Sequence, residues 1–248
     1  RMGGVLSDYD RVLKQRNSLL KSARAARVAA SQLSTLDVWD ERLVDLGSEI
    51  IEARGRLVSA LRPFVGEAYA AIAGEVHEAE LASELSILGA APDEETEVSE
   101  QTVRTEIDAA EAAAAFTAAL AHNRRAELDR GLTLSGPHRD DLLLRLNGLP
   151  ARGYASHGES WSFALALRLA SAALLRADSP VGDPVLILDD VFAELDESRR
   201  LRLADAVGGY EQVLITAAVE GDVPAALAAN TVRIRAGRVL EPGEEAAS

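Results

Sequence analysis

The sequence predicts an α/β protein: half of an ATPase-like lobe with buried parallel strands, plus an inserted helical-hairpin arm. The apolar run 185–188 ends abruptly at Asp189 and Asp190, as expected for a strand buried on both faces of a parallel sheet. From residue 36 to 64, apolar side chains recur in alternating steps of three and four, which indicates a helix packed along another helix. The 248 residues suffice for one large domain or two smaller ones.

Composition limits the class of protein. The chain contains no cysteine, which excludes disulfides and cysteine-ligated metals and is compatible with a reducing cytoplasm. No apolar run approaches the roughly 18–20 residues that a membrane span needs, and the first residues do not resemble a signal peptide. We therefore expect a cytoplasmic protein with no membrane partner.

The charge is unevenly distributed. A net charge of −14 argues against indiscriminate binding to nucleic acid. Residues 1–27, however, carry seven Arg or Lys against two Asp. The candidates for contact with a phosphate backbone are Arg11, Lys14, Lys21 and Arg24. The alternative is one solvated helix face, which is the usual role of such a cluster.

The first half is predicted to be mostly helical. A helix spans 5–30, and a second begins at Ser34, where Ser34–Asp37 has the pattern of a capping box. Pro63 is expected to end or kink this helix, with helix resuming over 65–80. A short strand is expected within 82–91, at residues 85–88. Residues 92–100 form an acidic linker that cannot bury much surface.

The second half alternates strands and helices. A helix runs from 103 or 107 to about 130, and strands follow at 132–135 and 142–146, the latter closed by an Asn147-Gly148 hairpin turn. The remaining elements are a helix over 160–176, the strand 185–188, a helix over 197–206, a strand over 212–216, a short helix over 223–229 and a hairpin of 231–235 with 238–240.

Four parts follow from these elements. Residues 1–95 are expected to form the helical arm, and 96–180 the linker, a helix, a hairpin and a helix start. Residues 181–240 carry the strand with the two acids, and 241–248 form an acidic tail.

Four features in the second half could carry chemistry. Ser156 and Gly158 begin a helix, whose free N–H groups and positive dipole end favour an anion, although most such starts are only caps. Asp189 and Asp190 lie at the carboxyl end of a strand, where open α/β sheets bind ligands. Residues 193–196 follow directly, and a further strand ends at Thr216.

A different reading concerns residues 137–141, Pro-His-Arg-Asp-Asp, which could suggest a metal site. We disfavour a metal-dependent hydrolase, because these residues alternate sides in an extended segment and no second histidine cluster exists among four histidines.

In this order, the features resemble the second half of an ATP-binding-cassette ATPase of the DNA-repair type. Residues 156–159 resemble its signature motif, 186–190 Walker B, 193–196 the D-loop and 215–217 the switch strand. The segments 136–142 (Gly-Pro-His-Arg-Asp-Asp-Leu), 14–21, 37–40 and 155–159 are similar to the RecF family of bacterial recombination mediators. This resemblance covers nearly the whole chain.

The resemblance implies roles for single residues. Asp189 would hold Mg²⁺, and Asp190 would orient the attacking water. Ser156 and Gly158 would close on the γ-phosphate of ATP bound by a second subunit, so that ATP drives homodimerisation. Asp196 would lie at the same interface, and Glu159 and Thr216 would be nucleotide-binding residues.

Three departures from the family pattern modify this expectation. Asp190 replaces the Glu of most cassette ATPases, and Ala217 replaces a switch histidine; both fit slow hydrolysis. The phosphate-binding pattern G-x-x-x-x-G-K-[ST] does not occur in the 248 residues. We therefore expect an N-terminally truncated form that is inactive as an ATPase by itself, since ATP and Mg²⁺ both need that loop.

By resemblance, the function is ATP-dependent binding of single-stranded, gapped or junction DNA, in recombinational repair and the SOS response. RecR and RecO would be the partners in loading recombinase. The alternative is a catalytically silent interaction module. A relative of the SMC type is disfavoured, because the seam of 36–64 is too short for the long coiled coils of that group.

Overall fold

The computed structural model describes residues 2–27, 34–74, 77–89, 102–104 and 106–240. The predicted linker 92–100 and tail 241–248 lie outside these residues. The chain divides into two compact units, one of residues 1–66 and 78–155, the other of residues 67–77 and 156–248. The boundaries expected at 95 and 180 stay a prediction.

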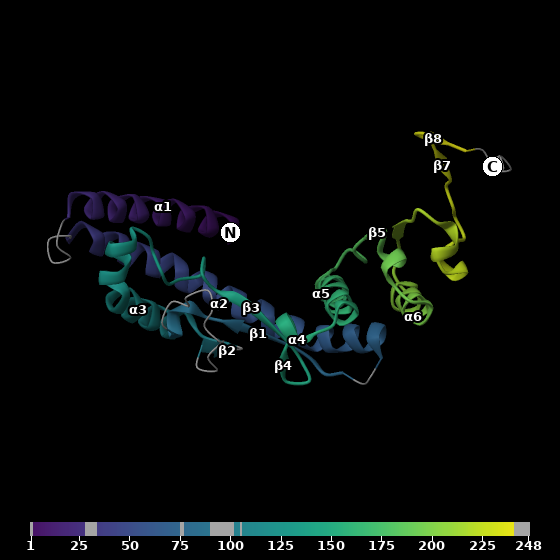
Figure 1. The fold of residues 1–248 in the computed structure, drawn as a ribbon, viewed down its shortest axis with the longest axis horizontal. Helices are drawn as coiled ribbons and strands as arrows, with labels where there is room; N and C mark the ends of the chain where they lie inside the picture. The colour runs from purple at the N-terminus through teal and green to yellow at the C-terminus, as the bar shows by residue number, and fades with distance from the viewer. Residues whose placement is uncertain (1, 28–33, 75–76, 90–101, 105, 241–248) are drawn as a thin grey trace. The chain divides into compact units, whose positions relative to one another are not determined.

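Three helices dominate the first unit: α1 (Met2–Ala26), the longer part of α2 (Ser34–Ala73) and α3 (Ala109–Arg130). Figure 1 shows α1 folding back along α2, which confirms the predicted helical hairpin. Tyr9, Leu43, Ile50 and Phe116 belong to one buried cluster, which all three helices share. The predicted seam is buried at its start, as at Leu36 and Leu43, whereas Leu57 is 52% exposed.

The α2 helix does not end at Pro63, contrary to one outcome predicted for this residue. Helix continues to Ala73, and Val65, Tyr69 and Ile72 are fully buried beyond the proline. A proline inside a helix costs about 3 kcal/mol, and burying these side chains offsets that cost. The helix stops before Gly74, whose φ of +93° is left-handed, so the predicted helix over 65–80 is wrong for its last residues.

The sheet of the first unit is antiparallel, in the order β2-β1-β3-β4. Its strands are β1 (Ala79–Glu84), β2 (Val103–Arg104), β3 (Asp141–Leu146) and β4 (Leu149–Pro150), and the short helix α4 (Ala151–Tyr154) follows. Asn147 and Gly148 have φ of 52° and 78°, which confirms the hairpin turn between β3 and β4.

Two strand predictions in this unit were wrong. The strand expected at 85–88 lies earlier, as β1, and residues 86–88 form a 3₁₀ turn. Residues 132–135 are not a strand, because their polar groups bond to helices instead: Thr133 N donates to Asn17 Oδ1 and Leu134 N to Glu127 Oε1, both at 2.8 Å. The segment therefore lies across α1 and α3.

A buried arginine connects the parts of the first unit. Arg16 of α1 is fully buried. Its guanidinium donates to Asp40 of α2 at 2.6 Å, to Glu127 of α3 at 2.7 Å and to the Thr133 hydroxyl at 2.8 Å. Since Glu127 is also fully buried, the pair neutralises two charges inside the core.

The second unit contains α5 (His157–Asp178), α6 (Glu197–Val207) and the parallel strands β5 (Leu186–Asp189) and β6 (Val213–Thr216). A terminal hairpin pairs β7 (Ile234–Arg235) with β8 (Arg238–Val239). In place of the short helix expected over 223–229, 3₁₀ turns occupy 220–222 and 225–227.

The pair of strands in the second unit is covered on one face only. Leu186 and Leu188 are buried, whereas Ile187 is 69% and Leu214 49% exposed. The prediction of a strand buried on both faces is therefore wrong for the residues that the structure describes. Because parallel sheets in α/β proteins are normally covered on both faces, this apolar face lacks the cover that such a sheet requires.

In the ranges described, no helix combines the length and the apolar character needed to cross a membrane.

Candidate functional site

The two acids of the central strand form a compact polar group with Thr216. In the parallel register of β5 and β6, Asp189 lies opposite Thr216. The Thr216 hydroxyl donates to Asp189 Oδ1 and accepts a hydrogen bond of 3.1 Å from the Asp190 N–H. The carboxyl ends of both strands are thereby joined through side chains, and all three residues are exposed.

Asp190 adopts a left-handed backbone conformation, with φ 53° and ψ 22°. Aspartate is one of the few residues that tolerate this region, which turns the chain sharply after β5. The 3₁₀ turn Val191–Glu194 follows, with Phe192 fully buried as its anchor. The turn leaves the carboxylates of Asp189 and Asp190 at the surface.

This group has the chemistry expected of a magnesium site. Carboxylate and hydroxyl oxygens are hard donors, and Mg²⁺ is typically held by one or two carboxylates together with phosphate oxygens and water. Asp189 would hold the ion, with its carboxylate oriented by the Thr216 hydroxyl, and Asp190 is the adjacent carboxylate. When bound, Mg²⁺ would supply charge stabilisation to a phosphate group.

The start of α5 is a complete capping box. Ser156 Oγ accepts from the Glu159 N–H at 3.3 Å, and Glu159 Oε2 accepts from the Ser156 N–H at 2.7 Å. The hydrogen bonds to Ser156 are the main reason that the pKa of Glu159 is lowered. The predicted helix start at 160 therefore lies slightly earlier, and Ser156, Gly158 and Glu159 share one turn.

The start of α6 is built in a similar way. Asp196 caps this helix by accepting a hydrogen bond of 2.9 Å from the Arg199 N–H. The Arg199 side chain then reaches the start of α5, because a Cβ added to Gly158 would lie 2.8 Å from Arg199 Nη1. The predicted site residues thus form two clusters. One consists of Asp189, Asp190 and Thr216. In the other, Arg199 connects the residues at 156–159 with Asp196.

Sequence reasoning did not identify Arg199. It is one of three arginines in the Glu197–Val207 helix, and nothing in the local pattern distinguishes it from Arg200 or Arg202. Its role depends on a contact with a residue about 40 positions earlier in the chain.

The segment 136–141 has a structural role in the first unit. His138 Nδ1 is 2.8 Å from the Tyr9 hydroxyl, and its Nε2 is 3.3 Å from the Thr133 carbonyl oxygen. Asp140 Oδ1 accepts from both the N–H and the hydroxyl of Ser86, at 2.9 Å each. Within the described ranges, no three His, Asp or Glu side chains are grouped as a metal site would require.

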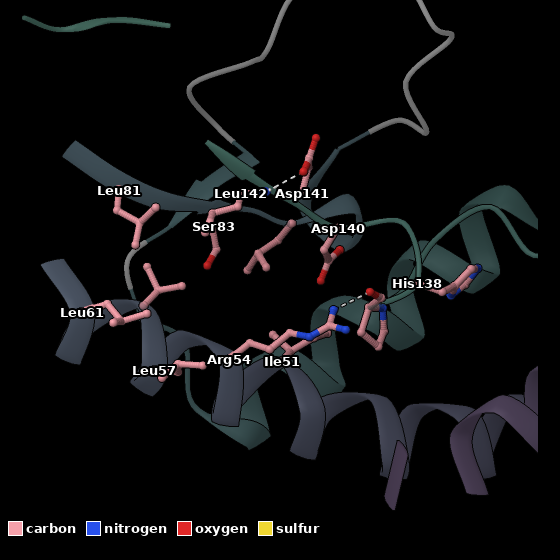
Figure 2. Close-up of a pocket in the computed structure, with 13 residues that line it drawn as sticks. Ile51, Arg54, Leu57, Leu61, Leu81, Ser83, His138, Asp140, Asp141 and Leu142 are labelled. Atoms are coloured by element: carbon pink, nitrogen blue, oxygen red, sulfur yellow. Dashed lines mark hydrogen bonds between the residues drawn. The ribbon is translucent and has the colours of Figure 1, made fainter. Parts of the chain in front are cut away.

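The same segment forms one wall of a cavity of about 510 Å³. Figure 2 shows Asp140 and Leu142 facing Arg54, Leu57 and Leu61 of α2 across this space. Asp140 Oδ2 is buried and has no hydrogen-bond partner among the residues that the structure describes, and burial raises the pKa of Asp140 to about 6. Burial also lowers the pKa of His138 to about 4.

The four basic candidates lie on exposed positions of α1. Arg11 pairs with Asp8 at 3.4 Å, and Arg24 Nη1 donates to the Arg130 carbonyl oxygen at 3.3 Å. Lys21 lies beside Gly131 at the end of α3. The steps of three and seven between these four positions place them along one stripe of the helix.

We predict that Asp140→Asn stabilises the first unit increasingly as pH rises from 4 to 7. The folded-state pKa of Asp140 is raised, so its contribution to stability is fully present below about 4 and is lost as pH passes 6. The difference between variant and wild type should grow by up to about 3 kcal/mol in urea unfolding.

His138 has the opposite effect on stability over this pH range, but it is present in both proteins and cancels in the difference. Asp141→Asn, at the exposed neighbouring carboxylate, is the control and should show no such trend. A constant difference between Asp140→Asn and wild type over this range would contradict the prediction.

Comparison with known proteins identifies relatives along the chain. The DNA replication and repair protein RecF of Clavibacter michiganensis subsp. michiganensis is 64% identical over 246 residues, which cover 97% of this chain and 60% of the relative. RecF of Leifsonia xyli subsp. xyli is 58% identical over 242 residues, covering 98% and 62%. No protein-family profile matches the chain.

The fold agrees with these relatives. A solved structure of the recombination mediator RecF of the RecFOR pathway with ATPrS superposes with a TM-score of 0.69 at 26% identity, covering 90% of this chain and 54% of that one. The structure with ATP gives 0.67 at 25% identity, covering 88% and 53%. The predicted fold class is thereby confirmed. The chain spans about 60% of the length of the curated relatives it matches, and over that span it belongs to the RecF family.

Proposed function

We propose that this chain is part of a RecF-type protein of DNA replication and repair that binds DNA in an ATP-dependent manner. The observation that carries the proposal is the joined group of Asp189, Asp190 and Thr216, in a chain 64% identical to a RecF protein over nearly its whole length. ATP and Mg²⁺ are the proposed cofactors, since relatives were solved with ATP and ATPrS.

The carboxylates are assigned separate tasks. We assign Asp189, which accepts a hydrogen bond from the Thr216 hydroxyl, to the Mg²⁺ side, and Asp190 would orient the attacking water. Neither carboxylate can act without groups that hold the phosphates of ATP, and the chain contains no G-x-x-x-x-G-K-[ST] pattern for that task. The exposed apolar face at Ile187 and Leu214 is where we propose that a complementary lobe packs.

The helix start at Ser156, Gly158 and Glu159, together with Asp196, is proposed to meet ATP held by a second copy. Its first-turn N–H groups and the dipole of the 22-residue α5 favour a phosphate there. ATP would thus promote homodimerisation. Hydrolysis would be slow, because Asp190 is shorter than glutamate and Ala217 offers no imidazole.

The RecFOR pathway named for the solved relatives supports RecO and RecR as partners. We further propose that the three proteins load recombinase in recombinational repair and in the SOS response. We place this work in the cytoplasm, where chromosomal DNA lies. Co-purification of RecR or RecO with the intact protein from cell extracts tests this; recovery of the protein with membranes would contradict it.

The alternative function is a catalytically silent interaction module. The observation that favours it is the missing phosphate-binding pattern, since the only lysines, Lys14 and Lys21, lie in α1. The two proposals differ in whether the intact protein turns over ATP.

For the ATPase proposal, we predict that Asp190→Asn in the intact protein keeps ATP binding but lowers turnover by about 100-fold or more, because the group that orients water loses its charge. Asp189→Asn should weaken Mg²⁺-dependent binding as well. Steady-state hydrolysis and equilibrium binding of a fluorescent ATP analogue measure the two effects. Asp205→Asn, an exposed carboxylate of α6, is the control.

An intact wild-type protein without Mg²⁺-dependent hydrolysis would reject the ATPase proposal in favour of the silent module. Unchanged turnover in Asp190→Asn would remove the role given to that residue.

For DNA binding, we predict that Lys14→Ala with Lys21→Ala weakens binding of the intact protein to gapped DNA and lowers the salt dependence of the affinity. Each lost phosphate contact reduces the slope of log K against log salt by about 0.9 for duplex DNA. Arg42→Ala with Arg56→Ala removes the same charge from α2, and this double variant should keep a steeper salt dependence of the affinity than the lysine double variant. Equal slopes for the two double variants would exclude the basic stripe of α1 as a DNA contact.

A further inference from the structure

Arg199 lies between two helix starts of the second unit. Its backbone N–H is held by the capping carboxylate of Asp196, and its Nε is 3.6 Å from Asp196 Oδ2. The side chain is only 27% exposed, compared with 58% for Asp196. The guanidinium is therefore turned inward from the start of α6, toward neighbouring parts of the same unit.

The other side of the guanidinium packs against the start of α5. A Cβ on Gly158 would lie 2.8 Å from Nη1 and 3.6 Å from both Cζ and Nη2. The guanidinium therefore lies against the position that a side chain at residue 158 would occupy, and a larger residue there would push it aside. Glycine permits this close approach.

The charge of Arg199 also acts on the first turn of α5. The hydrogen bonds to Ser156 lower the pKa of Glu159 most, and His77 and Arg199 lower it further. Nearby, Tyr69 packs on Phe163 of α5 with ring centroids 5.5 Å apart, which also holds this helix in place. The start of α5 is thereby held by a buried ring contact and by one arginine.

We propose that Arg199 is a positioning residue that fixes the start of α5 to the start of α6, through Gly158 on one side and Asp196 on the other. The proposal rests on the proposed function, in which both helix starts meet ATP held by a second copy. A guanidinium suits this task, because its several N–H groups can lie near a carboxylate on one side and reach a second element on the other. Without Arg199, the start of α5 and the start of α6 would no longer be held in a fixed position relative to each other.

The test uses the intact protein and separates ATP binding from ATP-dependent association of two copies. Arg199→Ala should leave the ATP affinity within about twofold, since the group at Asp189 is untouched, and weaken ATP-dependent association in sedimentation velocity at least about tenfold. Arg199→Lys should restore it only in part, because an ammonium can pair with Asp196 but is a compact point charge without the fork that reaches Gly158.

The matched control is Arg202→Ala. Arg202 lies one turn further along α6, and its Nη1 donates to the Ile72 carbonyl oxygen at 3.2 Å, so it contributes to the same unit without reaching Gly158. Its removal should change thermal stability at least as much as removal of Arg199, yet leave association intact. Equal losses of association in both variants would show a merely structural role and overturn the proposal.

A double-mutant cycle with Asp196→Asn adds a second readout. Asparagine remains a good helix cap but carries no charge, so the substitution removes the pairing with Arg199 together with any effect of the Asp196 charge at the interface, and the cycle separates these two contributions. The two substitutions should be non-additive in their effect on association. Two results would overturn the inference about Arg199 alone: additive effects in the cycle, or unchanged association in Arg199→Ala when the wild type associates. If the wild type does not associate in the presence of ATP, both the proposed function and this inference are overturned.

Discussion

The first unit depends on one buried ion pair. Arg16 and Glu127 are both fully buried, and removing a charge of this kind from water is favourable only when its hydrogen bonds are satisfied. Arg16 meets that condition with Asp40, Glu127 and Thr133, which belong to α2, α3 and the segment after α3. Glu127 uses its second oxygen for Leu134 N. The pair therefore fixes how α1, α2 and α3 lie against one another. It thereby also positions the basic stripe of α1 and the segment that carries His138 and Asp140.

In the second unit, a core that includes Phe163, Phe192 and Leu203 supports the helix starts and strand ends. Ser156 and Asp196 cap α5 and α6, and Arg199 joins the two caps. Thr216 holds Asp189 and Asp190 at the ends of the parallel strands. These are the positions where helix dipoles and carboxylates act on phosphate and metal. Ile187 and Leu214 form an apolar face that the described residues leave exposed, whereas a parallel sheet is normally covered on both faces.

Local signals predicted most of the second half. The helix start at Ser156, the Asn147-Gly148 turn and the strand before Asp189 each depend on neighbours in the sequence, and each is present, although the strand is covered on one face only. The failures involve distant partners. Residues 132–135 were taken for a strand because their bonds to Asn17 and Glu127 are not visible in the local pattern, and Pro63 stays helical because of burial beyond it. Arg199 was missed for the same reason, since its contact with Gly158 is made only in the fold.

The most direct test of this account is the unfolding of the 248-residue chain with Arg16→Met, followed by Trp39 fluorescence in a Trp161→Phe background so that only the first unit is observed. Leaving Glu127 buried and uncompensated should cost about 3–5 kcal/mol in urea, and adding Glu127→Gln should recover part of this loss. Arg11→Met, at an arginine whose side chain is 72% exposed, should change stability by less than about 0.5 kcal/mol. An Arg16→Met chain as stable as Arg11→Met would contradict the account.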